Sequence, residues 1–480
     1  MTAAAPALPG IFEGIRPRPR WRELRLLIIA TAAIIAGSVS LQLARSDQGV
    51  GIAKGLSPAE PLHLLVYLGV LFGVHVAQVV TGRRTDQVLL PAVGLLGGIS
   101  LLLMERLLQD LVVQHVGSAD LGLADVQLVW LCLSFILAGA IAIVVRSDLW
   151  LRQYKYTWAA AGVGLLLLTF VLGSEINGQR LTLSFGPVSG QPSELLKVIL
   201  VVFLAGYLSE NRPLLVQEST KVGPVSIPPL PYLAPMVAMW AIALGIVVVQ
   251  RDLGAALLFF AVFLLLTYAA TGRLGYVGLG IVLFLVGAFF MYQLLPHVRS
   301  RVDVWIDPFV SPQTSGYQII HALYAFGRGG LLGTGLGAGL PTIGSGQPGG
   351  IPEIHTDFPF AALGEELGLI GVLAILGLYL VVIERGLRIA ASAGDDFRSL
   401  LAAGLALVIG VQAFIIAAGN LKLIPLTGIT LPFISYGGSS LLVNGIVVGL
   451  LLALSDKGVE PPPPPRPPSR ARRLARRLGA

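Results

Sequence analysis

The chain has 480 residues, of which 55% are hydrophobic and only 12% are charged, and its mean hydropathy is +0.81. This composition excludes soluble protein classes and indicates a protein that crosses a membrane several times. A net charge of +7 would suggest a nucleic-acid partner in a soluble protein, but here the basic residues flank apolar runs. We therefore expect contact with membrane lipid and no nucleic-acid binding. The single cysteine, Cys132, has no partner for a disulfide.

Apolar runs long enough to cross a bilayer as a helix, about 20 residues each, recur along the chain. They predict an all-α, polytopic bundle of roughly twelve transmembrane helices. The first run begins near Arg22 and has full helix length, so it predicts a retained span and not a cleaved signal peptide. The predicted spans cover residues 24–43, 61–81, 87–106, 124–145, 157–174, 195–210, 233–250, 253–271, 274–294, 358–384, 398–418 and 430–454.

The distribution of lysine and arginine predicts the orientation of these spans. An even number of spans places both termini on one side, which holds about 23 basic residues against about 9 on the other. We therefore expect a cytoplasmic basic tail at 1–23 and a cytoplasmic tail rich in proline and arginine at 455–480. Attraction to anionic lipid is the favoured role of the second tail, and docking of a partner is the alternative. The long connection at 296–357 is then extracytoplasmic.

The sequence contains no GxxxxGK[ST] loop, and its cytoplasmic loops are too short to form a nucleotide-binding domain. An enzyme of this kind would take its energy from its substrate, and a transporter would take it from an ion gradient. Two classes fit: a transferase that uses an activated, lipid-linked donor, and a transporter.

The connection at 296–357 holds the densest set of polar residues in the chain. Apolar periodicity over 316–333 predicts that part of it re-enters the bundle as helix, and glycine-rich segments allow close backbone approach. Irregular backbone at membrane depth requires a protein-lined or wet cavity, so we expect the site here. The polar residues are Arg299, Arg301, Asp303, Asp307, Gln318, His321, Arg328, Glu353, His355, Thr356 and Asp357.

Asp357 stands directly before the predicted helix that starts near Pro359, and two interpretations, which need not exclude each other, have equal weight. It caps free amides at the helix start, or it acts as a general base whose partial burial raises its pKa. Glu365 and Glu366 follow on the same helix and point about 100° apart, so at least one must face the bundle interior. Either they belong to a functional site or they form interhelical ion pairs.

A second polar group opens a predicted helix at the same outer surface, in "GQPSELLK" at 190–197. Ser193 and Glu194 fit a helix cap, and Glu194 with Lys197 fits an (i, i+3) ion pair. The alternative is that Lys197, helped by Arg180, contacts an anionic group such as a pyrophosphate. In "GITLPFISYGGSSLL" at 428–442, the small residues predict close helix packing, with Ser435, Ser439 and Ser440 as possible polar lining. His297 and His321 lack the spacing of a metal site.

Four stretches together resemble the SEDS family (shape, elongation, division and sporulation), the RodA and FtsW type of bacterial cell-wall proteins. They occur in the family's order, the similarity spans roughly residues 87–454, and the long block from HTDF to GEELG is the most specific. The stretches are "NGQRLTLSFGPVSGQPSELLK" at 177–197, "QRDLGAALL" at 250–258, "GYQIIHALYAFGRGGLLGTGLGAGL" at 316–340 with "IPEIHTDFPFAALGEELGLIG" at 351–371, and "LPFISYGGSSLL" at 431–442.

The resemblance implies a peptidoglycan glycosyltransferase that serves cell elongation or division. Such proteins polymerise lipid II, a disaccharide-pentapeptide on undecaprenyl pyrophosphate, at the outer face of the cytoplasmic membrane. The family's essential aspartate falls on Asp357, which would deprotonate the acceptor sugar hydroxyl with inversion at the donor. Lys197 matches the family's lysine after PSE and Arg180 its loop arginine, and both look suited to the leaving pyrophosphate. The other substrate-binding residues that we expect are Glu194, Arg301, Gln318, His355, Thr356, Glu366, Ser435 and Ser439.

The resemblance also implies a partner, since family members typically act with a class B penicillin-binding protein, a transpeptidase. A divalent cation, Mg²⁺ or Mn²⁺, is compatible with a pyrophosphate donor, although no ligand set in the sequence identifies one. The chain departs from the family pattern in two additional N-terminal helices at 24–86, in Leu181 where tryptophan is usual, in Arg251 and in Pro359. The competing functions are a lipid II flippase and a noncatalytic scaffold that recruits the transpeptidase.

Overall fold

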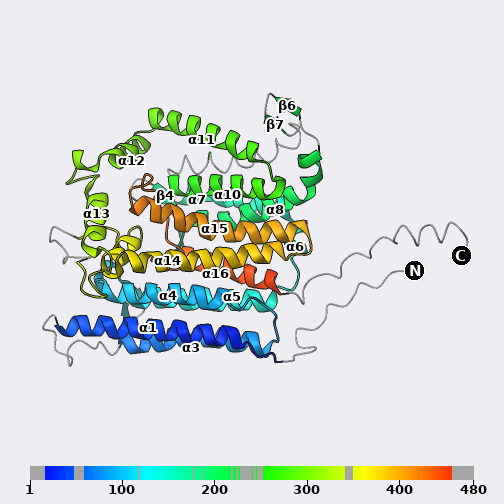
Figure 1. Ribbon diagram of the computed structural model, residues 1–480. Coiled ribbons are helices and arrows are strands. Elements are labelled where there is room, and N and C mark those ends of the chain that lie inside the picture. Colours follow the sequence, from blue (N-terminus) through cyan, green and yellow to red (C-terminus); the bar gives the residue numbers. More distant parts are fainter. Residues whose placement is uncertain are drawn as a thin grey trace, which may run out of the picture.

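The protein is a bundle of long helices that lie side by side, as the computed structural model in Figure 1 shows. Eleven helices within the described residues are long and apolar enough to cross a membrane. The predicted polytopic helical membrane fold is confirmed. The predicted span at 233–250 lies outside the described residues apart from Ala241 and Gly245, so the total of twelve stays a prediction. The structure describes residues 17–47, 59–116, 119–176, 179–185, 188–217, 220–222, 225–227, 241, 245, 252–340 and 350–456.

The candidate membrane helices follow the predicted apolar runs closely. They are α1 (Trp21–Asp47), α3 (Ala59–Val80), α4 (Leu89–Arg106), α5 (Leu123–Val144), α7 (Lys155–Leu172), α8 (Pro192–Gln217), α10 (Leu253–Thr271), α11 (Leu274–Leu294), α14 (Pro359–Ala391), α15 (Asp396–Asn420) and α16 (Gly438–Ser455). Three shorter helices are α6 (Leu149–Gln153), α12 (Pro296–Ile306) and α13 (Tyr317–Gly329), and two 3-10 turns are η1 (Gln109–Leu111) and η2 (Pro308–Val310).

Short antiparallel strands occur in the connections between helices. β1 (Gln114–Val116) pairs with β2 (Ala119–Leu121), and β6 (Thr220–Val222) pairs with β7 (Val225–Ile227). β4 (Gln179–Phe185) lies between β3 (Ser174–Ile176) and β5 (Val188–Gly190) in a three-stranded sheet. This sheet brings the chain from α7 to the first residue of α8, where one part of the site begins.

The centre of the bundle is formed by helices whose buried faces are mainly apolar, with a few buried charged side chains such as Lys197 on α8. The most hydrophobic windows of α4, α8 and α15 are 83%, 78% and 78% buried, whereas that of α11 is only 11% buried. α15 contacts α8, α10 and α14, and α16 packs along α5. In Figure 1, α11 and α12 arch over the bundle and lead to α13 at one end. The site elements α12, α13 and the start of α14 therefore gather at that end.

The two additional N-terminal helices pack on the bundle, α1 against α4 and α3 against α5. A buried polar network joins them to α14 at the end opposite α13. Arg20 pairs with Glu23, and the other oxygen of Glu23 lies 2.6 Å from Nδ1 of His75. Arg20 also donates to the carbonyl of Asp86 at 2.9 Å, and the Asp86 carboxylate accepts from Nε of Arg385 at 2.9 Å. Because buried charges are stable only when paired, this network fixes α1 and α3 to α14.

α14 is interrupted at Gly368, whose φ of +66° is left-handed. The glycine-rich segment after α13 fills the interruption. The amides of Thr334 and Gly335 donate to the carbonyls of Glu365 and Glu366 at 3.0 and 2.9 Å. In return, the amides of residues 369 and 370 donate to the carbonyls of residues 330 and 331. The backbone groups that the break releases are therefore satisfied within the protein, as membrane depth requires.

The structure corrects one helix boundary and adds order to the predicted loop. α16 begins at Gly438 and not near residue 430, because residues 421–437 form an irregular segment with left-handed Phe433 and Gly428. The apolar residues of this segment resemble a span in sequence but are buried as loop. Within the connection at 296–357, α13 confirms the predicted helix at its periodic stretch, and α12 is a helix that the sequence analysis did not predict.

We expect Gly368→Ala to destabilise the fold, by at least about 2 kcal/mol. A Cβ at this position would overlap the backbone nitrogen of Gly333, and the left-handed φ disfavours alanine in any case. The matched control is Gly377→Ala on the same helix, where a Cβ would have no neighbour within 4 Å. The control should leave the thermal unfolding midpoint in detergent unchanged or raise it, since alanine favours helix. Equal midpoints for both variants would contradict our account of the break.

Candidate active site

A cavity of about 160 Å³ lies where α12, α13 and the start of α14 meet. Its polar lining includes the carboxylate of Asp357, the guanidinium of Arg301 and the amide of Gln318, three residues that the sequence analysis selected. We call it the outer cavity. Its lining residues are Ser300, Arg301, Val304, Ser315, Gln318, Ile319, Asp357, Leu426 and Gly428.

Asp357 is held by a tight turn and does not cap α14. Its amide donates to the carbonyl of Glu353 at 2.9 Å, and its own carbonyl accepts from Nδ2 of Asn420 at 2.9 Å. The residue at the N-cap position is Phe358, and no side chain caps the helix. Of the two interpretations of Asp357, capping is therefore wrong. Its partly buried carboxylate faces the outer cavity instead.

The environment of Asp357 makes its carboxylate a stronger base than an exposed aspartate. Burial and the nearby charge of Glu353 raise its pKa to about 6, while Arg301 and a hydrogen bond from Thr356 act in the opposite direction. Burial is the largest of these effects. A group with this pKa is mostly ionised at neutral pH yet can accept a proton from a reacting hydroxyl.

Arg301 comes from α12 and is oriented by the backbone of the irregular segment before α16. Its Nη1 donates to the carbonyls of Leu426 and Thr427 at 3.1 and 3.0 Å. Nearby on the same helix, Nε1 of Trp305 donates to the carbonyl of Lys422 at 3.0 Å. These bonds hold α12 over the cavity and keep a permanent positive charge beside Asp357.

A second, smaller cavity of about 20 Å³ surrounds the start of α8. Lys197 is 2% exposed, and its Nζ lies 2.6 Å from Oε2 of Glu194 and 2.8 Å from Oε1 of Gln412. Asp252, at the start of α10, also lines this inner cavity, and burial together with the charge of Glu194 raises its pKa. The predicted (i, i+3) pair of Glu194 and Lys197 is present. It lies in a cavity with a second carboxylate and not at an exposed helix cap.

The two cavities share one wall residue, Gly428. Its φ is +75°, and a Cβ placed on it would lie 3.9 Å from both Nη1 of Arg301 and Oδ2 of Asp357. A side chain at this position would therefore project between the base and its neighbouring cation. Gly428 therefore borders both the outer cavity with Asp357 and the inner cavity with Lys197.

The other predicted site residues near Asp357 mainly support its turn. Ser435 donates to the carbonyl of Thr356 at 2.6 Å, and the amide of Tyr436 donates to the carbonyl of His355 at 2.8 Å. Burial lowers the pKa of His355, against the opposing effect of the Glu353 charge, and so favours the neutral imidazole. Ser439 accepts from the amide of residue 191 at 3.0 Å and so fixes the approach to α8. None of these four residues lines either cavity in the part of the chain that the structure describes.

Glu365 and Glu366 are both fully buried and lie apart from the two cavities. Nε of Arg328 donates to Glu365 at 2.9 Å, and Nε of Arg106 donates to Glu366 at 3.2 Å. The amides of residues 340 and 337 also donate to these carboxylates. Ion pairing, one of the two interpretations of these residues, is what the contacts show. Arg180 belongs to β4, but its side chain lies outside the described residues.

Three residues at the site were not selected from the sequence: Asp252, Gln412 and Asn420. Asp252 carries a weak signal, because an aspartate before an apolar run predicts a helix cap, and its carboxylate does accept from the amide of Ala255 at 2.9 Å. Gln412 and Asn420 are single amides within an apolar helix. A polar residue at that depth is a functional hint, but its partner is distant in sequence.

The residues of the inner cavity do not form a metal site. Among the described residues, no group of three or more His, Cys, Asp or Glu side chains is arranged to hold a metal ion. Glu194 and Asp252 are carboxylates, but the ammonium group of Lys197 already occupies the position beside Glu194. The Mg²⁺ or Mn²⁺ that the resemblance implies therefore stays a prediction.

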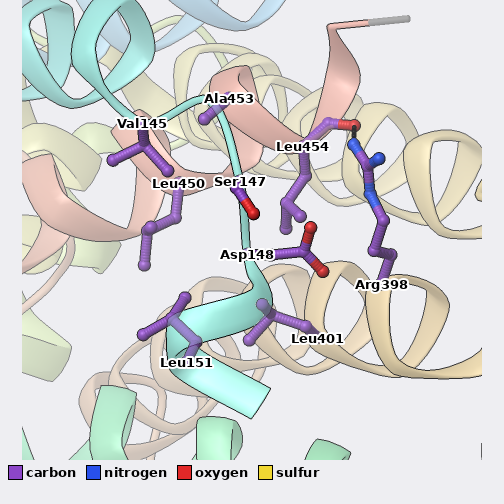
Figure 2. Close-up of a pocket in the computed structure, with 9 residues that line it drawn as sticks. All are labelled: Val145, Ser147, Asp148, Leu151, Arg398, Leu401, Leu450, Ala453 and Leu454. Carbon is purple, nitrogen blue, oxygen red and sulfur yellow. Dashed lines mark hydrogen bonds between the residues drawn. The ribbon is translucent and has the colours of Figure 1, made fainter. Parts of the chain in front are cut away.

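A third cavity lies at the opposite end of the bundle, between the end of α5, the start of α15 and the end of α16 (Figure 2). Its volume is about 10 Å³, enough for one water molecule. Leucine, alanine and valine side chains form most of its wall, and Arg398 at its edge donates to the carbonyl of Leu454 at 3.1 Å. No predicted site residue lines it, so the outer and inner cavities are the candidate active site.

Comparison with known proteins gives one consistent family. The model of the FtsW/RodA/SpoVE family, described as cell cycle proteins, matches residues 87–459. The chain is 37% identical over 448 residues to the peptidoglycan glycosyltransferase RodA of Mycobacterium tuberculosis, covering 93% of this chain and 92% of that protein. It is 36% identical over 328 residues to the probable peptidoglycan glycosyltransferase FtsW of Geobacter metallireducens, covering 67% and 83%.

Solved structures resemble the fold described above. A chain from a peptidoglycan synthase complex, studied for its coordination of polymerization and crosslinking, superimposes with a TM-score of 0.57 at 26% identity, covering 78% of this chain and 98% of that one. RodA of Thermus thermophilus, a rod shape determining protein, gives a TM-score of 0.53 at 25% identity, covering 78% and 97%. Together with the order of the four sequence motifs, these matches show that the chain belongs to the SEDS family of RodA- and FtsW-type proteins.

Proposed function

We propose that this protein is a peptidoglycan glycosyltransferase that polymerises lipid II at the outer face of the bacterial cytoplasmic membrane. The observation that carries the proposal is that a base and a cation lie in two neighbouring cavities that share one lining glycine. Asp357 faces the outer cavity, Lys197 lies in the inner cavity, and Gly428 lines both. The names of the relatives, which are peptidoglycan glycosyltransferases, support the same activity.

In the proposed reaction Asp357 accepts the proton of the acceptor sugar hydroxyl. The freed oxygen attacks the anomeric carbon of the donor sugar from the face opposite the pyrophosphate, so the configuration inverts. The new glycosidic bond forms as the bond to the pyrophosphate oxygen breaks. Undecaprenyl pyrophosphate leaves with that electron pair, and the proton remains on Asp357 until solvent removes it.

Stabilising the charge of the departing pyrophosphate is the second requirement of this reaction. Arg301 supplies a permanent cation in the outer cavity, and Lys197 supplies another in the inner cavity. Gln318 adds an amide that can contact a sugar hydroxyl. Because the cavities lie at the end of the helices, a polyprenyl tail can remain in the membrane while the sugars reach the base.

The location and the partner belong to the same proposal. We place the α13 end of the bundle outside the cytoplasm and both termini inside, as the distribution of basic residues predicts. The partner would be a class B penicillin-binding protein that crosslinks the glycan strands. The similarity to a chain of a peptidoglycan synthase complex supports this assignment.

The proposal is tested by incubating the purified protein and its transpeptidase partner with labelled lipid II in detergent. Electrophoresis should resolve a ladder of glycan strands. Detergent micelles have no two sides, so a flippase would produce no ladder, and a scaffold would produce neither a ladder nor lipid movement in vesicles. Absence of a ladder with a partner that binds the protein would refute the glycosyltransferase assignment.

We expect Asp357→Asn to reduce the initial rate of glycan formation at least about 100-fold, because an amide cannot accept the hydroxyl proton. The control is Asp303→Asn on α12, whose exposed carboxylate accepts from the hydroxyl of Tyr292 at 3.0 Å and does not line either cavity among the described residues. This control should retain most of the activity. A ladder of normal rate from Asp357→Asn would show that another group is the base.

The rate should also depend on pH with a single ionisation near the pKa of Asp357, about 6. A base acts in its deprotonated form, whose fraction rises as pH rises through the pKa. The value of kcat/KM should therefore be roughly tenfold lower at pH 5 than at pH 7 and should level off above pH 7. A rate that falls as pH rises over this range would contradict the assignment.

Replacing Lys197 should slow glycan formation, while Asp357 can still act as the base. Lys197→Met removes the cation of the inner cavity, and we expect a loss of at least about tenfold in kcat. Lys155→Met is the matched control, because Lys155 is also buried and ion-paired, with Glu210 at 2.7 Å, but lies at the other end of the bundle. Equal activity of the two variants would remove Lys197 from the proposed mechanism.

A further inference from the structure

The turn that presents Asp357 begins with a residue in an unusual backbone conformation. Glu353 has a φ of +53° and is one of three non-glycine residues with positive φ in the described part of the chain. A side chain in the left-handed region normally carries a conformational cost, which glycine or asparagine would reduce. The strain lies four residues before the proposed base, at the point where the chain turns into α14.

The carbonyl oxygen of Glu353 accepts several hydrogen bonds from the residues that follow it in the turn. It accepts from the amides of Thr356, Asp357 and Phe358 at 3.2, 2.9 and 3.4 Å, and from the hydroxyl of Thr356 at 3.2 Å. This arrangement fixes the backbone of Asp357 from one side, while Asn420 fixes its carbonyl from the other. The left-handed residue is therefore what directs the Asp357 carboxylate toward the outer cavity.

The side chain of Glu353 affects the Asp357 carboxylate in two ways, by its negative charge and by competing for the proton of the Thr356 hydroxyl. Its Oε2 lies 3.3 Å from the hydroxyl of Thr356, which has a single proton to donate. When that proton is held by Glu353, it is not available to stabilise the ionised form of Asp357. The negative charge of Glu353 raises the pKa of Asp357, whereas a hydrogen bond from Thr356 lowers it, so competition by Glu353 for the Thr356 proton acts in the same direction as its charge.

The other elements that face Asp357 contribute one charge of the opposite sign. Arg301 from α12 favours the ionised carboxylate, and Gln318 from α13 is neutral. The segment before α16 presents Leu426 and Gly428 to the cavity, neither of which ionises. Glu353 is thus the acidic group that acts on Asp357 against the effect of Arg301, which also interacts with Asp252 at the start of α10.

We propose that Glu353 is a positioning residue for the base: its backbone directs Asp357 into the outer cavity, and its carboxylate keeps Asp357 ready to accept a proton beside Arg301. The inference rests on the proposed role of Asp357. Glu353 itself does not contact the reacting atoms in this proposal, since its side chain is exposed and does not line the cavity.

Three substitutions separate the charge of Glu353 from its conformation. Glu353→Gln removes the charge and keeps the strained residue, Glu353→Gly removes the charge and accepts the left-handed φ without strain, and Glu353→Asp keeps a carboxylate. The measurement is the pH dependence of kcat/KM for glycan formation from lipid II between pH 5 and pH 8, with the full chain and its transpeptidase partner.

We expect both the glutamine and the glycine variants to move the acid limb of the profile to lower pH, on the order of half a pH unit. Their plateau rates should fall a few-fold, because a weaker base transfers the proton less readily. In Glu353→Asp the acid limb of the pH profile should lie close to its position in the unmodified protein. A residue with only a structural role would lower the rate at every pH and leave the limb where it was.

Two outcomes overturn the inference. An unshifted acid limb in both Glu353→Gln and Glu353→Gly refutes the role of the charge, and Glu353→Gly serves this purpose even where the glutamine variant fails to fold. Asp357→Asn, measured beside them, separates the role of Asp357 as the base from the role of Glu353. If that variant retains full activity, the proposed base itself is wrong. If it is inactive while the limb of the Glu353 variants stays fixed, only the role of Glu353 is wrong.

Discussion

Inside a membrane, every backbone amide and carbonyl must find a partner within the protein, and this constraint governs the part of the fold that holds the site. α14 breaks at Gly368, and the glycine-rich segment after α13 supplies the missing partners. The segment can do so because Gly333 and Gly368 allow two backbones to touch. As a result α13 is fixed against the first half of α14, and the turn before α14 faces α12 across a cavity. The same segment contacts α1, since a Cβ at Gly337 would lie 2.9 Å from Cδ1 of Leu41. The additional N-terminal helix therefore braces the break.

The chemistry of the candidate site follows from a balance between burial and charge. Burial favours the protonated form of the Asp357 carboxyl group, whereas the positive charge of Arg301 favours its ionised form. With both present, and with Glu353 adding negative charge, the pKa of Asp357 is about 6. In the inner cavity a buried charge is likewise balanced by its neighbours, because Lys197 contacts both Glu194 and Gln412. Gly428 lines both cavities, so a single backbone position borders the base Asp357 in one cavity and the cation Lys197 in the other.

Motifs and hydrophobic periodicity predict the helical bundle, the helix α13, and the gathering of Asp357, Arg301 and Gln318 around one cavity. These features depend on local sequence. The start of α16 was misplaced because the apolar residues of 430–437 have the composition of a span, and only their tertiary burial shows them as loop. Helical geometry required at least one of Glu365 and Glu366 to face inward. That both are buried depends on the segment that covers the break, which no local pattern reveals. Contacts such as Lys197 with Gln412 join residues more than 200 positions apart.

The ion pairs of Glu365 and Glu366 have a consequence for biosynthesis. A carboxylate inside a membrane helix opposes insertion, by about 3 kcal/mol at the helix centre, and α14 carries two of them near its start. Their partners, Arg106 on α4 and Arg328 on α13, precede α14 in the chain and are translated before it. Both guanidinium groups are thus synthesised before the acidic segment that they neutralise in the folded bundle. The order of the segments along the gene matches the order in which their charges are needed.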